Sequence, residues 1–305
     1  MSAGRSEYAS ASASSSVFGS PPRAKLSPAE AHSYLEEGLQ GAKRHSYRSA
    51  TSFVTTIIKC MKEFQFGGAA QYAVYSPVTH EEFTKVADMR NRDLKGLRFL
   101  YLTDERTLIV KFIVGESHEI AHRRFIEIVM RKAIMMGLRM DFIDIGKTRF
   151  SGIGSQKEGD TAFKPTSRPL ATDWPTLVFE CGVSESLQRL RVDARWWLEN
   201  SEGEVGTVVL VTVSKEERSL HVEQWELADM PKNPDVAQAN PDPFIIGVKK
   251  TGEVDIVGEV VTGAPLKISF KKTMLRDYDE ALGEGDFVLD VQDFKEVARI
   301  LWRFS

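Results

Sequence analysis

Cysteine is scarce in this sequence: Cys60 and Cys181 are the two cysteines in 305 residues. Two thiols cannot build a disulfide framework, and they cannot supply a four-thiolate zinc site. We therefore expect two reduced, buried thiols, which is typical of an intracellular protein.

Long apolar runs and a strong net charge are also missing. No uninterrupted apolar run approaches the roughly 18 residues that a membrane span needs, and the first thirty residues contain no apolar signal-peptide segment. The formal net charge of -3 gives no overall attraction to nucleic acid or to an anionic membrane, so any basic surface must be local. We expect a nuclear or cytoplasmic protein without a membrane anchor, and the sequence leaves its oligomeric state open, a homo-oligomer included.

What is present is the composition of a globular protein, with 42% hydrophobic and 27% charged residues. Residues 1–26 are rich in Ser and Ala and predict a disordered tail. Residues 27–95 show helical patterns, among them a capping-box spacing at Thr79 and Glu82. Residues 96–228 alternate strand and helix patterns, and residues 229–305 predict a β-rich extension that ends in a helix.

The central region predicts a mixed α/β core. Residues 97–115 read as two strands around a turn at 104–106, and residues 116–136 as a long helix that ends at Gly137. Further strands, a second amphipathic helix at 185–200 and a hairpin at 207–227 follow. Strand–helix alternation is too sparse for a regular βαβ array, so we expect a mixed sheet flanked by helices.

A carboxylate inside an apolar strand is the first candidate for chemistry. In PTLVFECG, strand alternation puts Leu177, Phe179 and Cys181 on one face and Glu180 on the other, beside Gly182. Small neighbours leave room for something bulky, and Asp160 opens another short strand 20 positions earlier. Two such carboxylates form a hard-oxygen pocket that suits Mg²⁺ or Mn²⁺. The plainer alternative is a strand Glu that faces solvent or pairs with Arg, and a turn Asp.

The order of several motifs resembles the PD-(D/E)XK phosphodiesterase superfamily. The match is closer to the putative restriction endonucleases expanded in cyanobacteria and to related fungal proteins of unknown role. It covers roughly residues 75–227, through THEEF (79–83), GESHEIA (115–121), KEGDTAFKP (157–165), WPTLVFECGVSES (174–186) and DARWWLENSEGEV (193–205).

The resemblance implies a restriction-endonuclease-like core at 96–228 that hydrolyses the phosphodiester bonds of nucleic acid, with DNA preferred over RNA. It implies that Asp160 and Glu180 hold Mg²⁺ or Mn²⁺, with Glu119 as an additional acid. Arg123, Arg124, Lys157 and Arg195 are candidate nucleic-acid contacts.

The main departure from the superfamily pattern is Gly182, which stands where a lysine is expected two residues after the Glu. Arg191, on the following helix, is our candidate substitute. Because an arginine stays protonated, it could stabilise charge but could not act as a base. The alternative function is therefore a catalytically degenerate nuclease-fold module that binds nucleic acid or protein.

A third function comes from HEIAH, residues 118–122, which matches the zinc-peptidase pattern H-E-x-x-H. The motif lies in the first turn of its helix, and no H-x-x-G-x-x-H extension follows it. A zinc metallopeptidase therefore ranks below the two nuclease-like hypotheses.

Overall fold

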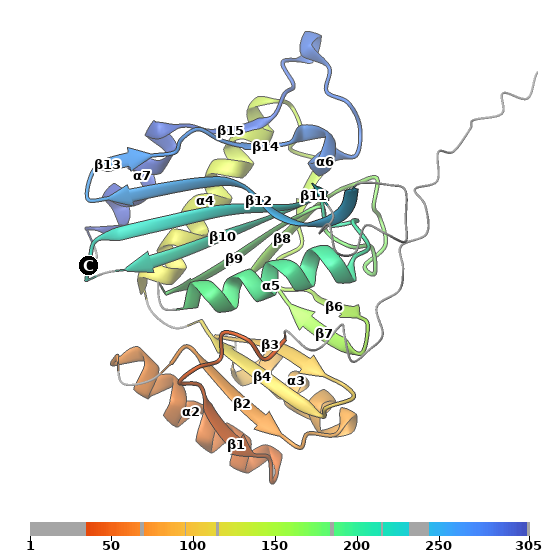
Figure 1. Ribbon diagram of the computed structural model, residues 1–305, viewed down its shortest axis with the longest axis vertical. Coiled ribbons are helices and arrows are strands. Elements are labelled where there is room, and N and C mark those ends of the chain that lie inside the picture. The colour runs from red at the N-terminus through yellow and green to blue at the C-terminus, as the bar shows by residue number, and fades with distance from the viewer. Residues whose placement is uncertain are drawn as a thin grey trace, which may run out of the picture.

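Two large β-sheets, a small two-stranded sheet and the helices between and around them form the structure, a computed structural model shown in Figure 1. It describes residues 35–67, 70–94, 96–113, 116–183, 186–214, 216–231 and 244–303. The predicted disordered tail, 1–26, lies outside these residues. The predicted class, a mixed α/β fold with mixed sheets flanked by helices, is confirmed.

The larger sheet has seven strands in the order β13-β12-β11-β10-β9-β8-β5. Strands β9 and β10 are parallel, and the other neighbouring pairs are antiparallel. Helix α5 is the crossover that two parallel neighbours require. The bounds are β5 Phe142–Asp144, β8 Thr161–Pro165, β9 Leu177–Val183, α5 Leu187–Asn200, β10 Thr207–Ser214, β11 Ser219–Pro231, β12 Phe244–Val257 and β13 Val260–Thr262.

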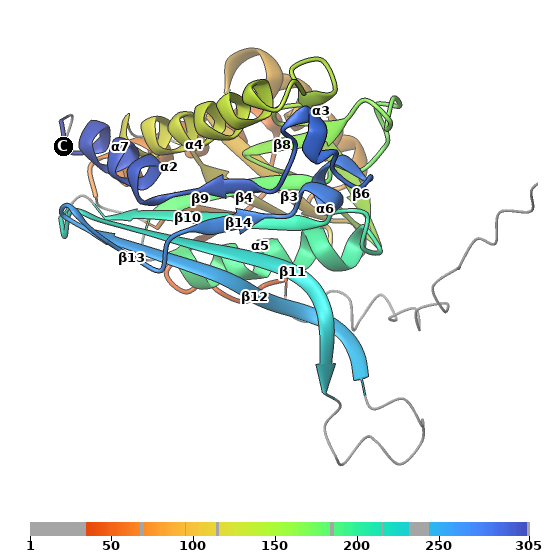
Figure 2. The ribbon, with the colours of Figure 1, turned by 90° about the horizontal axis from the view of Figure 1, so that it is seen from above.

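The two faces of this sheet are covered differently (Figure 2). Helices α4 (Glu116–Met135) and α7 (Val291–Leu301) pack on one face, where they share an apolar core with Leu177, Phe179 and Cys181. Helix α5 packs on the other face, in a second core that includes Val178. The predicted alternation along β9 is thus present, because one face of the strand is wholly apolar.

The smaller sheet has six strands in the order β1-β2-β4-β3-β7-β6. One face packs against α2 (Ala50–Gln65) and α3 (His80–Asp93), and the other shares a core with α5. Helix α5 therefore lies between the two sheets (Figure 1). The strand bounds are β1 Lys43–Ser46, β2 Tyr72–Ser76, β3 Leu97–Leu102, β4 Thr107–Phe112, β6 Arg149–Gly152 and β7 Ser155–Glu158.

Most of the long periodic segments form the predicted elements: the hairpin β3–β4, helices α4 and α5, and the hairpin β10–β11. The capping box is also present, since the Thr79 amide donates to Glu82 and the Glu82 amide donates to Thr79 Oγ1. The expectation that residues 27–95 are helical needs correction, because they also contain strands β1 and β2. Strand β2 (YAVYS) is short but almost wholly buried, since it is paired on both sides within the smaller sheet.

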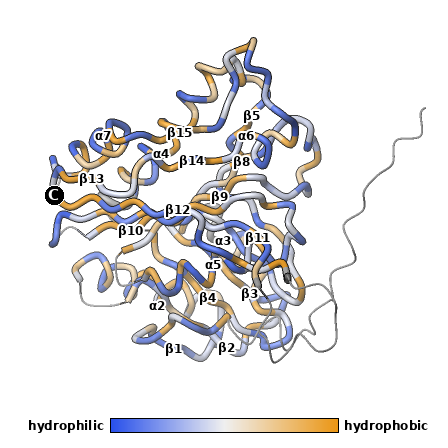
Figure 3. The backbone as a smooth tube through the Cα atoms, turned by 45° about the horizontal axis from the view of Figure 1, so that its top comes forward, coloured by the Kyte–Doolittle hydropathy of each residue, from blue (hydrophilic) through white to orange (hydrophobic). Residues whose placement is uncertain are grey.

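The C-terminal segment adds a small two-stranded sheet, β14 (Leu266–Ile268) and β15 (Phe287–Leu289). The short helices α6 (Phe270–Met274) and η3 (Glu280–Leu282) lie between these strands in the sequence, and α7 follows them. Apolar and polar residues alternate along the helices and strands, as the hydropathy colouring of Figure 3 shows. Among the described residues, no helix combines the length and the apolar character that a membrane crossing requires.

Candidate functional site

Asp160 and Glu180 come together at a lysine. Lys111 Nζ lies 2.8 Å from Asp160 Oδ2 and 2.9 Å from Glu180 Oε2. The two acids meet because β8 and β9 are antiparallel neighbours in which Thr161 pairs with Phe179. One step along that register, Asp160 lies opposite Glu180.

The contacts continue beyond Glu180. Lys157 Nζ lies 3.1 Å from Glu180 Oε1 and 3.2 Å from Asp193 Oδ1, and the Arg189 guanidinium lies 3.4 Å from the same Asp193 oxygen. Acids and bases therefore alternate, and we call the six side chains the buried ionic chain: Asp160, Lys111, Glu180, Lys157, Asp193 and Arg189.

The buried ionic chain joins the two sheets to the helix between them. Lys111 and Lys157 come from β4 and β7 of the smaller sheet, while Glu180 comes from β9 of the larger one. The strand β7 and Asp160 are only a few residues apart, because the segment KEGDTAFKP leaves one sheet and enters the other at Gly159. Space at that crossing is tight, since a Cβ on Gly159 would lie 3.0 Å from Trp197.

The carboxylate oxygens of Asp160 and Glu180 also accept hydrogen bonds from other groups. The backbone amide of Cys181 donates to Asp160 Oδ2 at 2.8 Å, and the indole of Trp197 donates to Glu180 Oε1 at 2.8 Å. Arg98 Nε lies 3.4 Å from Asp160 Oδ1. Hydrogen bonds and ion pairs with charged groups are shorter and stronger than those between neutral groups, so these contacts fix the positions of both carboxylates.

Burial makes these charges interact strongly. The side chains of Lys111, Asp160 and Glu180 are 4%, 1% and 0% exposed. Burial disfavours the Lys111 ammonium, but Asp160 and Glu180 outweigh it and hold the pKa of Lys111 well above its ordinary value. Lys111 is therefore a permanent cation between two carboxylates.

The space around the buried ionic chain is small. A cavity of about 10 Å³ adjoins Lys111, Lys157 and Asp193, which is close to the least volume that holds one water molecule. The expectation that Gly182 leaves room for a bulky group needs correction. A Cβ at Gly182 would lie 2.2 Å from Ser186 Oγ and 3.1 Å from Leu190 Cδ1.

A divalent ion does not fit this arrangement. Mg²⁺ sits about 2.0–2.1 Å from its oxygen ligands and keeps several waters, whereas Lys111 Nζ occupies the position between the two carboxylate oxygens. A second cation there would be repelled by the first, and there is no space for its waters. Binding of Mg²⁺ or Mn²⁺ by Asp160 and Glu180 stays a prediction, and it requires Lys111 to move away.

The remaining predicted site residues lie elsewhere, each in a local ion pair. Arg191 forms two hydrogen bonds with Glu223. Three pairs lie within one turn of a helix: Arg123 with Glu119, Arg124 with Glu127, and Arg195 with Glu199. Helix α4, which carries Glu119, Arg123 and Arg124, covers the face of the larger sheet opposite to α5. Of the predicted site residues, the fold brings together three: Asp160, Glu180 and Lys157.

A cluster of metal-binding residue types does occur among the described side chains. The ligand atoms of His221, Glu223 and Glu253 lie within 4.8 Å of one another. Glu223 is already bound by Arg191, and Lys250 Nζ lies 3.5 Å from Glu223. The negative charge of Glu223 is therefore neutralised by side chains of the protein.

The HEIAH motif does not form a recognisable zinc site among the described side chains. His122 is buried and Glu119 pairs with Arg123; the side chain of His118 lies outside the described residues.

Lys111 and Asp193 are site residues that our reading of the sequence missed. One signal was available, since Lys111 interrupts TLIVKFIVG, an otherwise apolar strand pattern. A lysine is almost never fully buried unless it is paired. That pattern therefore predicts a buried acid somewhere in the fold, although it cannot say which one.

Comparisons with known proteins give no family. No family model matches the chain, and no curated protein matches it. Among solved structures, one from Anabaena variabilis, described as a putative nuclease belonging to DUF820, matches with a TM-score of 0.41 and 12% identity. The match covers 73% of this chain and 99% of that one.

Proposed function

We propose that this chain is a nuclease-like module that binds nucleic acid without cleaving it by metal chemistry. One observation carries the proposal: the Lys111 ammonium lies between Asp160 and Glu180, where the superfamily that the sequence resembles would hold a divalent ion. An ammonium neutralises the acids, but it offers no open coordination position for a phosphate or a water molecule.

Accessibility supports the same conclusion. A phosphodiester bond must reach the acids to be hydrolysed, yet Asp160, Glu180 and Asp193 are at most 2% exposed and lie between two sheets. Arg191, the candidate replacement for the missing lysine, is bound to Glu223 instead. Nucleic acid as the partner rests on the order of the sequence motifs, and the preference for DNA over RNA stays a prediction.

Metal-dependent hydrolysis is the second candidate, because Asp160 and Glu180 do converge on neighbouring strands. In that case Lys111 would withdraw, and it or Lys157 would take the role expected at position 182. The zinc-peptidase hypothesis gains no support from the described part of HEIAH.

A combined binding and cleavage assay separates these functions. Fluorescently labelled single-stranded and duplex DNA and RNA are incubated with the protein in millimolar Mn²⁺ or in EDTA, beside the variant Asp160→Asn. The proposal predicts complexes of equal affinity in both buffers and intact nucleic acid throughout. Cleavage in Mn²⁺ that Asp160→Asn abolishes would establish the second candidate instead.

A further inference from the structure

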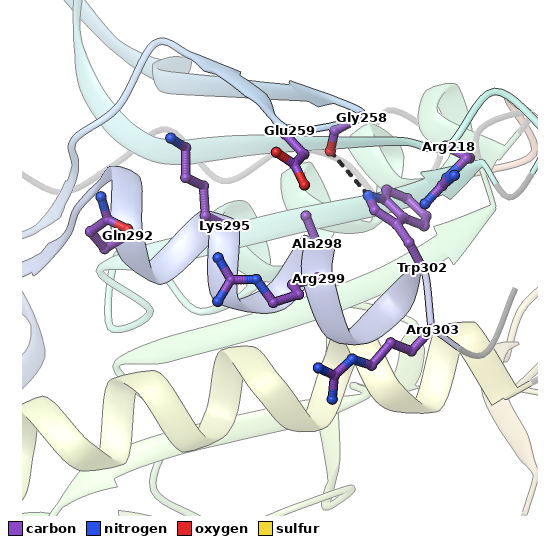
Figure 4. Close-up of a pocket in the computed structure, with 9 residues that line it drawn as sticks. All are labelled: Arg218, Gly258, Glu259, Gln292, Lys295, Ala298, Arg299, Trp302 and Arg303. Carbon is purple, nitrogen blue, oxygen red and sulfur yellow. Dashed lines mark hydrogen bonds between the residues drawn. The ribbon is translucent and has the colours of Figure 1, made fainter.

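A cavity of about 500 Å³ lies beside helix α7, and none of the residues discussed as a site above lines it. Figure 4 shows its wall: helix α7 on one side, and on the other the turn after β12 with Arg218 from the turn between β10 and β11. This volume lies within the range of small-molecule sites in proteins, about 300–1,000 Å³.

One face of α7 supplies most of the polar lining. Gln292, Lys295, Arg299 and Trp302 recur at separations of three, four and three residues, which places them along one side of the helix. The opposite side is buried in the apolar core through Phe294, Val297 and Leu301. The side chains that line the cavity are therefore not the ones that pack α7 against the core.

The charge of the cavity is strongly positive. Arg218, Lys295, Arg299 and Arg303 line it, against one acid, Glu259. Within the described part of the chain, none of the four cations forms a salt bridge with a carboxylate. A concentration of this kind stands out in a chain whose formal net charge is -3.

Acids are present on α7, but they serve another contact. Asp293 lies 2.7 Å from Lys132 Nζ and 2.9 Å from the Arg131 guanidinium, and Glu296 lies 3.2 Å from Arg131. These pairs hold α7 against α4. Only the side of α7 that faces the cavity keeps an excess of positive charge.

An aromatic ring is fixed in the same wall. The Trp302 indole donates a hydrogen bond to the Gly258 carbonyl at 3.1 Å, and the Gly258 amide donates to the Arg218 carbonyl at 3.0 Å. The Arg218 guanidinium lies 6.0 Å from the centre of the Trp302 ring. Both turns are thereby tied to the end of α7, and one of the four cations, Arg218, is held beside the ring.

From this geometry we propose that the cavity binds a nucleotide, with its base against Trp302 and its phosphate among the four cations. Base–aromatic stacking and arginine–phosphate contacts are the chemistry that such a lining offers. The helix dipole of α7 favours cations near its C-terminus, but it does not account for Arg218, which comes from another turn. The ligand is either the terminal nucleotide of a nucleic-acid strand or a free nucleotide. In the first case the inference rests on the proposed function, and in the second case it is independent of that function.

The test is a binding measurement with two probes. Fluorescence anisotropy follows a 5′-labelled oligo(dT), and isothermal titration calorimetry follows ATP, with inorganic tripolyphosphate as the ligand that lacks a base. We expect Trp302→Ala to weaken binding about 5- to 150-fold. Arg299→Gln should weaken oligonucleotide binding and reduce its salt slope by about 0.7. The matched control Arg44→Gln, an exposed arginine on β1 of the smaller sheet, should change neither.

The possible outcomes separate the cavity from the proposed function. Loss of binding in both cavity variants supports the site, and weaker binding of tripolyphosphate than of ATP supports the role of the ring. If Trp302→Ala fails to fold, Arg299→Gln and Trp302→Phe, which keeps a stacking surface, decide the question. ATP binding without oligonucleotide binding supports the cavity and contradicts the proposed function. Oligonucleotide binding that is unchanged in the cavity variants overturns the cavity and leaves the function standing, and no binding of either probe overturns both.

Discussion

Replacing Lys111 with methionine removes one buried charge and keeps most of the side-chain volume. At the effective dielectric constant of about 20 that suits buried sites, each contact near 2.8 Å is worth about 6 kcal/mol of Coulomb attraction. Desolvation of the ions offsets much of this in the wild type. In Lys111→Met, Asp160 and Glu180 stay buried without their shared partner, which costs about 3–5 kcal/mol.

The assay is equilibrium urea denaturation at neutral pH, followed by circular dichroism. The matched control is Lys85→Met, because Lys85 Nζ lies 2.7 Å from Glu81 in a pair whose lysine side chain is 62% exposed. Exposed pairs of this kind contribute about 0.3–0.5 kcal/mol. We expect the free energy of unfolding to fall several-fold more in Lys111→Met than in the control. A difference below about 1 kcal/mol between the two variants would refute the claim that Lys111 is the required partner of the acid pair.

Three further predictions follow from the same contacts. Gly182→Ala should lower the free energy of unfolding by about 1–3 kcal/mol through overpacking, whereas the control Gly285→Ala, where no atom lies within 4 Å of the new Cβ, should change it little; chemical denaturation of both variants checks this. In the same assay Trp197→Phe should cost more than Trp196→Phe, because Trp197 donates to a carboxylate and Trp196 to a neutral hydroxyl; equal losses would contradict it. A hydrogen bond with Glu223 raises the pKa of His221 despite the partial burial of the imidazole. Protonated His221 should therefore contribute up to about 1 kcal/mol to the free energy of unfolding. This contribution should be complete below about pH 6.5, the ordinary pKa of histidine, and should be lost as the pH rises through the raised pKa. Chemical denaturation of His221→Gln and the wild type across this pH range tests the prediction; a stability difference that grows as the pH rises would contradict it.

Local patterns were sufficient to predict most of the elements that frame the site, although not strand β7, which carries Lys157. The alternating strands around residues 104–106, the long helix that begins at Glu116 and the amphipathic helix that ends at Asn200 all form as expected. The alternation along residues 177–183 also identified which face of that strand carries Glu180. These features depend on periodicities of two and 3.6 residues, which a sequence displays directly.

The contents of the site could not be predicted in this way. Lys111 is 49 positions from Asp160 and 69 from Glu180 along the chain, and it belongs to a different sheet. Its arrival between the acids depends on how the two sheets pack, which no local pattern encodes. The space beside Gly182 was misjudged for the same reason, since Gln71 and Leu190 fill it from outside the strand.

Titration of the wild-type protein with Mn²⁺, followed by electron paramagnetic resonance of the free ion, tests the central claim most directly. If the Lys111 ammonium occupies the cation position between Asp160 and Glu180, these two residues bind no Mn²⁺. The signal of free Mn²⁺ should then follow the same titration curve with the wild type and with Asp160→Asn. One Mn²⁺ bound per chain in the wild type and lost in Asp160→Asn would contradict the account and restore the acid pair as a metal site.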